Sequence, residues 1–314
     1  MPRLARRPAA LAVAVLLALL AVAVLLLAGP GRSAAQSGDE PEAAERFAGG
    51  TCAKDAVRFG VVLPVGDAEG RAAADRLTQD LSEGLGCRAV TVVYATQAQL
   101  ITAIGMHDVD VAQLDPASTI VAARVTGAAP VGAYALDADT PARARPSEIW
   151  VRRSGGVRRL ADLRDRPIAL GPRGTAGGDL DPRAALLAAG VRVRGDDRAA
   201  FTDDDASALD ARRERRVDAA VTRGTPTGET VAGLRRIWTE TGPLGDVVVL
   251  RPGIPKALRR LVVSAVRKLP GAALAPLAAR QGIVDPAPLI TVPLDLYAPL
   301  GTRLDDLTAA GLIR

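Results

Sequence analysis

The sequence predicts an α/β protein of two lobes, each built on a mainly parallel sheet that helices flank. Short apolar runs typical of buried strands alternate with segments of helical period between residues 57 and 125. The alternation restarts after a polar stretch, 137–147. Residues 36–314 are enough for two lobes of about 100–150 residues each. Alternating strands and helices favour parallel pairing with right-handed crossovers.

The first half of the chain predicts one β-α-β-α-β series. Gly86 ends the first helix of the series, whose apolar stripe includes Leu77 and Leu81. The expected strands are Val57–Leu63, Ala89–Tyr94, Val109–Leu114 and Val131–Leu136, and the expected helices are Arg71–Leu85, Gln97–Gly105 and Pro116–Val125.

The second half repeats the alternation. Asp181 is expected to cap a helix that begins at Pro182 and stops at Gly190. The other expected elements are strands Glu148–Arg152, Pro167–Leu170, Val217–Thr222, Leu234–Trp238 and Val247–Leu250, a turn at Leu160–Leu163, and helices Ala206–Arg213 and Pro255–Leu269. We expect residues 272–314 to be mainly helical. The expected lobes are 51–146 plus 244–314, and 147–243, with a hinge near Arg145–Ser147 and Thr239–Asp246.

The N-terminus predicts export. Residues 1–8 hold three arginines, residues 9–29 are an apolar run, and Ser33-Ala34-Ala35 resembles a cleavage site. Residues 1–35 are therefore a signal peptide or, if uncleaved, a signal anchor, since 9–29 is long enough to span a bilayer. Residues 36–50 are expected to be a polar linker. Both alternatives place the body outside the cytoplasm, in the periplasm or on the outer face of the cell membrane.

Charge and composition exclude several function classes. The formal net charge is +5, but four arginines and no acid precede residue 36, so the body is nearly neutral and nucleic acid is not an expected partner. One histidine and two cysteines are too few for a zinc site. The chain lacks a G-x-S-x-G elbow and a P-loop. We expect no metal, no cofactor and no enzymatic activity.

The two cysteines predict a disulfide. Export makes a bridge chemically permissible, and Cys52 and Cys87 each lie just before an expected strand. Closing this loop would contribute about 3–4 kcal/mol in the chain-entropy model. The alternative is two free thiols.

Five segments carry a resemblance to a known family: Val57–Val62, Val109–Ser118, Ser154–Val157 with Leu160–Leu163, Ala169–Leu186 and Val217–Ala220. Together they resemble the substrate-binding proteins of phosphonate/phosphate-type ABC transporters, which have the type 2 periplasmic-binding fold. The likeness runs from about residue 55 to about residue 300. It implies two lobes joined by two crossover strands, which close on a small-molecule ligand and deliver it to an ABC permease in the membrane. We also expect the protein to be a monomer.

The candidate ligand site lies at the carboxyl ends of strands, where ligands gather in open α/β sheets. Loops at Pro64–Gly66, Asp115–Ser118 and Gly171–Gly178 are expected there, and their glycines let backbone N–H groups approach a ligand. The alternative for the last loop is a flexible turn without ligand. The candidate ligand-binding residues are Pro64, Asp115, Pro116, Ala117, Ser118, Gly174, Thr175, Ala176, Gly177 and Asp205.

The acidic run Asp203–Asp205 bears on the ligand. If these carboxylates line the cleft, a phosphonate about 4 Å away would meet repulsion of several kcal/mol, and an amine or a hydroxyl-rich ligand would suit them better. Alternatively, the run is a solvated helix start with one aspartate as N-cap. The alternative function is a membrane-anchored sensor or interaction module with a degenerate cleft.

Overall fold

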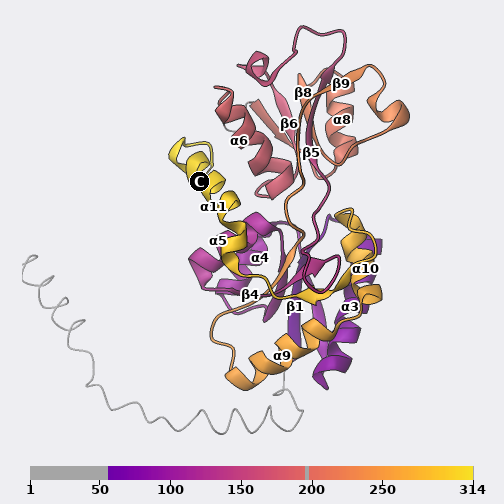
Figure 1. Cartoon of the computed structure of the whole chain (residues 1–314), viewed down its shortest axis with the longest axis vertical. Helices are drawn as coiled ribbons and strands as arrows, with labels where there is room; N and C mark the ends of the chain where they lie inside the picture. Colours follow the sequence, from indigo (N-terminus) through magenta and orange to yellow (C-terminus); the bar gives the residue numbers. More distant parts are fainter. Residues whose placement is uncertain (1–55, 195–197, 314) are drawn as a thin grey trace, which may run out of the picture. The chain divides into compact units, whose positions relative to one another are not determined.

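The structure, a computed structural model, describes residues 56–194 and 198–313 (Figure 1). The leader, the linker and Cys52 lie outside the described residues, so the Cys52–Cys87 bridge stays a prediction. The described part holds two mixed sheets, each flanked by helices.

The first sheet has six strands in the order β11-β4-β10-β3-β1-β2. Strand β1 pairs in parallel with β2 and β3, whereas β10 is antiparallel to both β3 and β4, and β11 is antiparallel to β4. Four strands therefore run in one direction, and β10 is inserted between two of them. The strands are β1 (Val57–Val62), β2 (Ala89–Tyr94), β3 (Val111–Leu114), β4 (Ala129–Ala135), β10 (Val247–Leu250) and β11 (Ala287–Ile290).

Helices cover both faces of this sheet, and together they form the first lobe. One apolar cluster includes Leu81 and Val262, and the cluster on the other face includes Leu100 and Leu307. The first cluster is built by α3 (Ala68–Leu85), α9 (Lys256–Lys268) and α10 (Gly271–Arg280), the second by α4 (Gln97–Gly105), α5 (Pro116–Thr126) and α11 (Ala298–Ala309).

The second sheet has the order β7-β6-β8-β5-β9, and with its helices it forms the second lobe. Strand β6 is parallel to β7 and β8, whereas β5 is antiparallel to β8 and β9. Helices α6 (Asp181–Ala188) and α8 (Asp205–Arg213) lie on its two sides (Figure 1). The strands are β5 (Ser147–Arg152), β6 (Ile168–Leu170), β7 (Ala199–Phe201), β8 (Ala219–Arg223) and β9 (Leu234–Glu240).

Two crossover segments join the lobes. Residues 136–146 lead from β4 to β5, and residues 241–246 lead from β9 back to β10. They run antiparallel, with Ala144 N–H donating to Pro243 O and Gly245 N–H donating to Ala142 O, both at 2.9 Å. The two-lobed α/β fold with a dominant strand direction and two crossovers is therefore confirmed. The exact lobe boundaries and the hinge stay predictions.

The prediction that Asp181 caps a helix is wrong. A π-helical turn, η2 (Ala176–Leu180), runs directly into α6, and the residue before Asp181 already has helical backbone angles (φ −72°, ψ −50°). An N-cap needs a non-helical backbone, and here Thr175 occupies that position with ψ 146°. The Asp181 side chain instead accepts a hydrogen bond from Arg303 of α11 at 2.5 Å.

Two edge strands, β7 and β11, were not predicted from the sequence. The four residues of β11 include Pro288, which lacks the N–H that a central strand needs. An edge strand tolerates proline because one of its sides makes no ladder bonds. Strand β11 lies at the end of the first sheet, where this condition holds.

Within the described residues no single helix is long and apolar enough to cross a membrane. Helices α9 and α10 reach that length and hydropathy only as a pair bent by 81°. Both contribute side chains to the core of the first lobe, including Val262, Val266 and Leu274.

Candidate functional site

A cavity of about 370 Å³ is lined by both lobes and both crossovers. Its walls are polar, with four carboxylates and three guanidinium groups. The lining residues are Asp115, Pro116, Asp246, Arg280 and Gln281 from the first lobe and its adjoining crossover end, Gly177, Asp204, Asp205, Ala206 and Arg223 from the second lobe, and Ala144, Arg145, Pro243 and Leu244 from the crossovers.

Asp115 joins the two lobes through one carboxylate oxygen. It is the N-cap of α5, and its Oδ1 accepts from Ala117 N–H at 2.9 Å. The same Oδ1 accepts from Ala176 N–H, the first residue of η2, also at 2.9 Å. Pro116 at the first position of α5 needs no acceptor. The N-termini of two helices from different lobes therefore converge on one carboxylate.

Burial and a neighbouring carboxylate raise the pKa of Asp115 to about 7. Burial is the larger cause, Asp246 adds to it, and the two backbone hydrogen bonds work in the opposite direction. Burial also raises the pKa of Asp246, whose Oδ2 accepts from Gln113 Nε2 at 2.9 Å. Two carboxylates with elevated pKa values thus lie at the first-lobe wall.

Replacing Asp115 by asparagine is expected to change how stability depends on pH. The folded pKa of about 7 exceeds the unfolded value of 3.8, so the folded protein holds a proton that the unfolded chain releases. The contribution is therefore fully present below about pH 4 and is lost as pH rises through about 7. Urea unfolding of both proteins between pH 4.5 and 8 should show that the unfolding free energy of the wild type falls relative to that of Asp115→Asn as pH rises toward 7. A difference that stays constant would contradict the assignment, since Asp246 and Asp181 titrate in both proteins.

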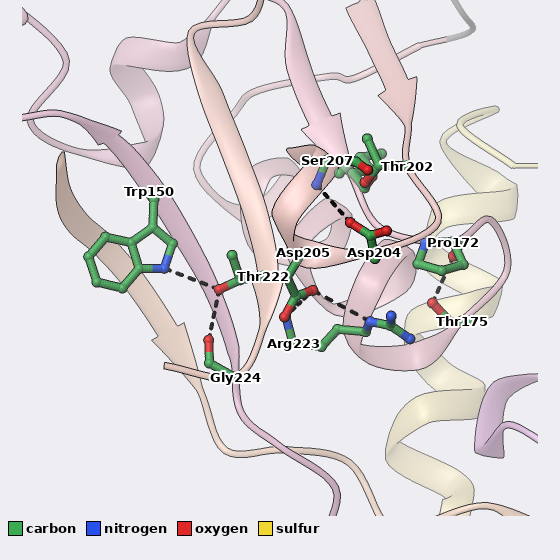
Figure 2. A network of polar contacts seen from close by, with 11 residues as sticks. Trp150, Pro172, Thr175, Thr202, Asp204, Asp205, Ser207, Thr222, Arg223 and Gly224 are labelled. Atoms are coloured by element: carbon green, nitrogen blue, oxygen red, sulfur yellow. Dashed lines mark hydrogen bonds and ion pairs between the residues drawn. The ribbon is translucent and has the colours of Figure 1, made fainter. Parts of the chain in front are cut away.

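The glycine-rich loop 171–178 is held mainly by its own bonds. Thr175 Oγ1 donates to Pro172 O at 2.7 Å (Figure 2), and Gly174 N–H donates to Asp179 Oδ2 at 2.9 Å. The Thr175 hydroxyl is therefore engaged within the loop and does not line the cavity. Gly177 does line it, and its backbone N–H belongs to the first helical turn, which has no intrahelical acceptor.

The acidic run contributes two of its three carboxylates to the cavity. Asp204 is the N-cap of α8, with Oδ1 accepting from Ser207 N–H at 2.7 Å, as the sequence predicts for one aspartate of the run. Both carboxylate oxygens of Asp205 accept from Arg223 N–H at 3.0 Å (Figure 2). Asp203 does not line the cavity.

Two of the three guanidinium groups at the cavity have carboxylate partners. Arg280 pairs with Asp67, and Arg223 Nε lies 3.8 Å from Asp205 Oδ1. Arg145 instead donates through Nη2 to Ala279 O at 3.2 Å.

Several buried polar atoms around the cavity have no hydrogen-bond partner among the described residues. Gln281 Nε2 and Arg223 Nε belong to lining residues. Ser147 is fully buried, and its Oγ lies 2.9 Å from the point that a β-carbon on Gly177 would occupy. Buried polar groups are normally paired, so these atoms are available to hydrogen-bond to a bound molecule or to ordered water.

A protein-family model matches residues 59–286. The model describes the periplasmic substrate-binding protein of phosphonate ABC transporters. The chain belongs to this family. It is therefore an extracytoplasmic solute-binding protein of an ABC importer, and its family is one of binding proteins and not of enzymes. No curated protein sequence matches the chain.

Solved structures share the fold of this solute-binding protein. PhnD1 of Prochlorococcus marinus, in complex with methylphosphonate, is 13% identical, with a TM-score of 0.64 over 81% of this chain and 98% of that one. A binding protein component of an ABC phosphonate transporter from Pseudomonas aeruginosa is 16% identical, with a TM-score of 0.60 over 79% and 85%. The aliphatic sulphonate-binding protein SsuA of Escherichia coli is 16% identical, with a TM-score of 0.51 over 82% and 88%.

The cavity of the binding protein brings together four of the ten candidate residues: Asp115, Pro116, Gly177 and Asp205. Ala117 and Ala176 lie behind Asp115 as its hydrogen-bond donors. The remaining candidates, Pro64, Ser118, Gly174 and Thr175, do not line the cavity.

The sequence analysis did not select most of the charged residues that line the cavity. Asp246 lies at the end of a predicted hinge segment, and Arg145 begins the other, so the crossovers were a usable signal for both. Arg280 is the last residue of α10 and Gln281 is its C-cap, about 165 residues after Asp115, and no local pattern marks them. The described residues contain no group of three or more His, Cys, Asp or Glu side chains that could hold a metal ion.

Proposed function

We propose that the solute carried by this importer protein binds in the cavity between the lobes. The observation that carries the proposal is a polar cavity lined by both lobes, where Gln281 Nε2 has no hydrogen-bond partner among the described residues. The buried Ser147 Oγ, which lies against the lining residue Gly177, has none either. A ligand that fills the cavity would bond to both lobes at once and favour the closed arrangement, which is the form that a permease can distinguish from the empty one.

The proposed contact residues are Asp115, Pro116, Gly177 and Asp205, together with Arg145 and Arg223. Ala117, Ala176, Gly174 and Thr175 act behind them, since their bonds hold Asp115 and the loop 171–178 in place. Pro64 and Ser118 stay predictions without a contact that supports them.

The cavity suits a small polar ligand. A volume of about 370 Å³ lies at the lower end of the range for small-molecule sites. The Prochlorococcus relative is in complex with methylphosphonate, a ligand of this size class. The present cavity differs in chemistry, because its carboxylates outnumber its guanidinium groups by one.

A binding experiment with one cavity variant tests the proposal. Full-length protein in mild detergent is titrated calorimetrically with methylphosphonate, phosphate, ethanolamine and glucose. Gly177→Val should weaken binding of the active probe at least about 100-fold, because even its β-carbon would lie 2.9 Å from Ser147 Oγ and its methyl groups would enter the cavity.

The matched control is Gly156→Val, at an exposed glycine of the same lobe with no atom within 4 Å of an added β-carbon. Circular dichroism separates lost binding from lost folding. If the Gly177→Val protein is folded and keeps the wild-type affinity, the ligand must bind at another site. Failure of the wild type to bind any solute would favour the sensor or interaction module with a degenerate cleft.

We further propose that residues 1–35 direct export, that the body is held by residues 9–29 if the leader is uncleaved, and that the mature protein is a monomer. Mass analysis of the exported protein decides between the two fates of the leader. An N-terminus at Gln36 means cleavage, and an intact Met1 means a retained anchor.

A further inference from the structure

Helix α9 has a strongly basic outer side. Its 13 residues include three arginines and two lysines and no acid, and the sequence has no aspartate or glutamate between residues 251 and 284. The opposite side of the helix is buried in the core of the first lobe through Val262 and Val266. The helix therefore presents its charge to solvent. The basic face, as we call its exposed cations, consists of Arg259, Arg260, Arg267 and Lys268.

The basic face is not neutralised by the residues that the structure describes. Among them, no carboxylate oxygen lies within 4 Å of its guanidinium or ammonium nitrogens. Helix α3 packs against α9, and a β-carbon on Gly84 would lie 3.2 Å from that of Ala265. The α3 acids on either side of this contact, Asp80 and Glu83, do not reach the basic face either. Its positive charge is therefore available to an external partner.

The chain that leads from the N-terminal apolar run enters the first lobe at the edge where α9 begins. Phe59 of β1 and Leu250, the last residue of β10, both pair with Val111 of β3. Strand β1 therefore starts at the edge of the sheet where β10 ends, and α9 follows β10. Figure 1 shows α9 at the end of the first lobe that lies opposite the crossovers. Residues 30–55 separate this edge from residues 9–29, and about 26 residues can reach at most about 90 Å.

The place and the sign of this charge favour an anionic lipid surface as the partner. A permease takes the solute from the cavity, which lies at the opposite edge, where β3 ends next to Asp115. A second copy of the chain would bring like charges together. Each Lys or Arg near an anionic bilayer favours contact about fivefold, so the four cations favour it on the order of 500-fold. Because the apolar side of α9 is held in the core, the contact is electrostatic and salt weakens it.

We propose that the basic face of α9 lies on the anionic phospholipid surface of the cell membrane, and that a body held by residues 9–29 rests there with its cavity turned away from the bilayer. The length of residues 30–55 lets the body leave this surface and turn toward a permease. The inference goes beyond the proposed function, because no residue of the basic face lines the cavity.

The rate at which Lys268 is acetylated measures this contact without an added label. The chain has three lysines, and mass spectrometry follows the modification of each by N-hydroxysuccinimide acetate. Full-length protein is reconstituted in vesicles of phosphatidylcholine, with or without about one-third phosphatidylglycerol. Phosphatidylglycerol should slow the acetylation of Lys268 at least about fivefold, and about 0.5 M sodium chloride should abolish the difference. The triple variant Arg259→Gln, Arg260→Gln, Arg267→Gln keeps Lys268 and should show less than about a twofold slowing.

The matched control is a second triple variant, which removes the same charge from exposed arginines of the second lobe: Arg153→Gln, Arg158→Gln, Arg164→Gln. It should keep the full slowing, and far-ultraviolet circular dichroism checks that all three proteins are folded. Equal acetylation rates of the wild type in the two kinds of vesicle would overturn the proposal. So would a slowing that the α9 variant retains, or one that the control variant loses as well.

Two further measurements separate this proposal from its neighbours. Slowing in native membranes but not in phosphatidylglycerol vesicles would overturn the lipid contact in favour of an acidic membrane protein. Calorimetric titration with methylphosphonate should give the same affinity for the α9 variant and the wild type, because the basic face lies outside the cavity. Absence of solute binding would end the proposed function and leave the acetylation result to decide the lipid contact.

Discussion

Replacing Asp179 by alanine is expected to lower the free energy of unfolding by about 3–5 kcal/mol, because it leaves a buried guanidinium without its counter-charge. The side chains of Asp179 and Arg183 are only 3% and 2% exposed, and Arg183 Nε donates to Asp179 Oδ1 at 2.5 Å. Arg183 Nη1 also donates to Val193 O and to Leu312 O, which follows α11. The pair therefore ties the glycine-rich loop, α6 and the segment after α11 together.

Urea unfolding followed by circular dichroism measures this loss. The control is Asp75→Ala, which removes an exposed partner of Arg71 and should cost less than about 1 kcal/mol. The double replacement of Asp179 by leucine and Arg183 by methionine should recover part of the loss, since it leaves no unpaired charge. A loss below about 1 kcal/mol in Asp179→Ala would mean that water reaches Arg183 and that the pair is not structural.

Ligand affinity is a second quantity that the Asp179→Ala replacement should change. Asp179 Oδ2 accepts from Gly174 N–H, so its removal also frees the loop that carries Gly177 into the cavity. We therefore expect ligand affinity to fall together with stability. Asp75→Ala should change neither.

Replacing Gly242 by alanine is expected to cost about 3 kcal/mol of stability and to alter the crossover. An added β-carbon would lie 2.0 Å from the carbonyl oxygen of Ala144 and 2.5 Å from that of Arg145. Both obstacles are backbone atoms of the other crossover, so no side-chain rotation relieves them, and the two segments must separate. The carbonyl of Gly242 also accepts from Arg143 Nη1 at 3.1 Å, a bond that such a movement would disturb.

Thermal unfolding and small-angle scattering with and without ligand measure the two effects. For a protein of this size, a loss of 1 kcal/mol lowers the melting temperature by about 2–4 °C. Gly156→Ala is the control, because nothing lies within 4 Å of its added β-carbon. Equal melting temperatures and equal ligand-induced compaction in the two variants would show that the crossovers tolerate separation.

Local sequence signals were sufficient for most elements. Gln97–Gly105 has the expected bounds because Thr96 and Gln99 form a capping box, a signal contained in four residues. Val247–Leu250 also has the expected bounds, since an apolar run of this kind becomes a fully buried strand. The edge strands β7 and β11 are short and only partly buried, so their pairing depends on the strand beside them and not on their own pattern.

Part of the candidate site was also predictable from local sequence signals, and part was not. The rule that ligands gather at strand carboxyl ends led to Asp115, Pro116 and Gly177, because each follows a strand within a few residues. It also led to Thr175, whose hydroxyl turned out to bond within its own loop. The direction of a side chain within a turn depends on the local hydrogen bonds, which composition and spacing do not specify.

The amino-acid sequence alone determined the class of protein, the succession of strands and helices and the two crossovers, because hydrophobic period, caps and turn residues act over a few positions. Only the tertiary structure decided that Asp115 bonds to Ala176, and that Asp246 and Gln281 join the same cavity. These residues are 35 to 166 positions apart, and they come together only after both sheets have formed. Electrostatic interactions depend on distance in space and on burial, and neither quantity exists until the chain is folded.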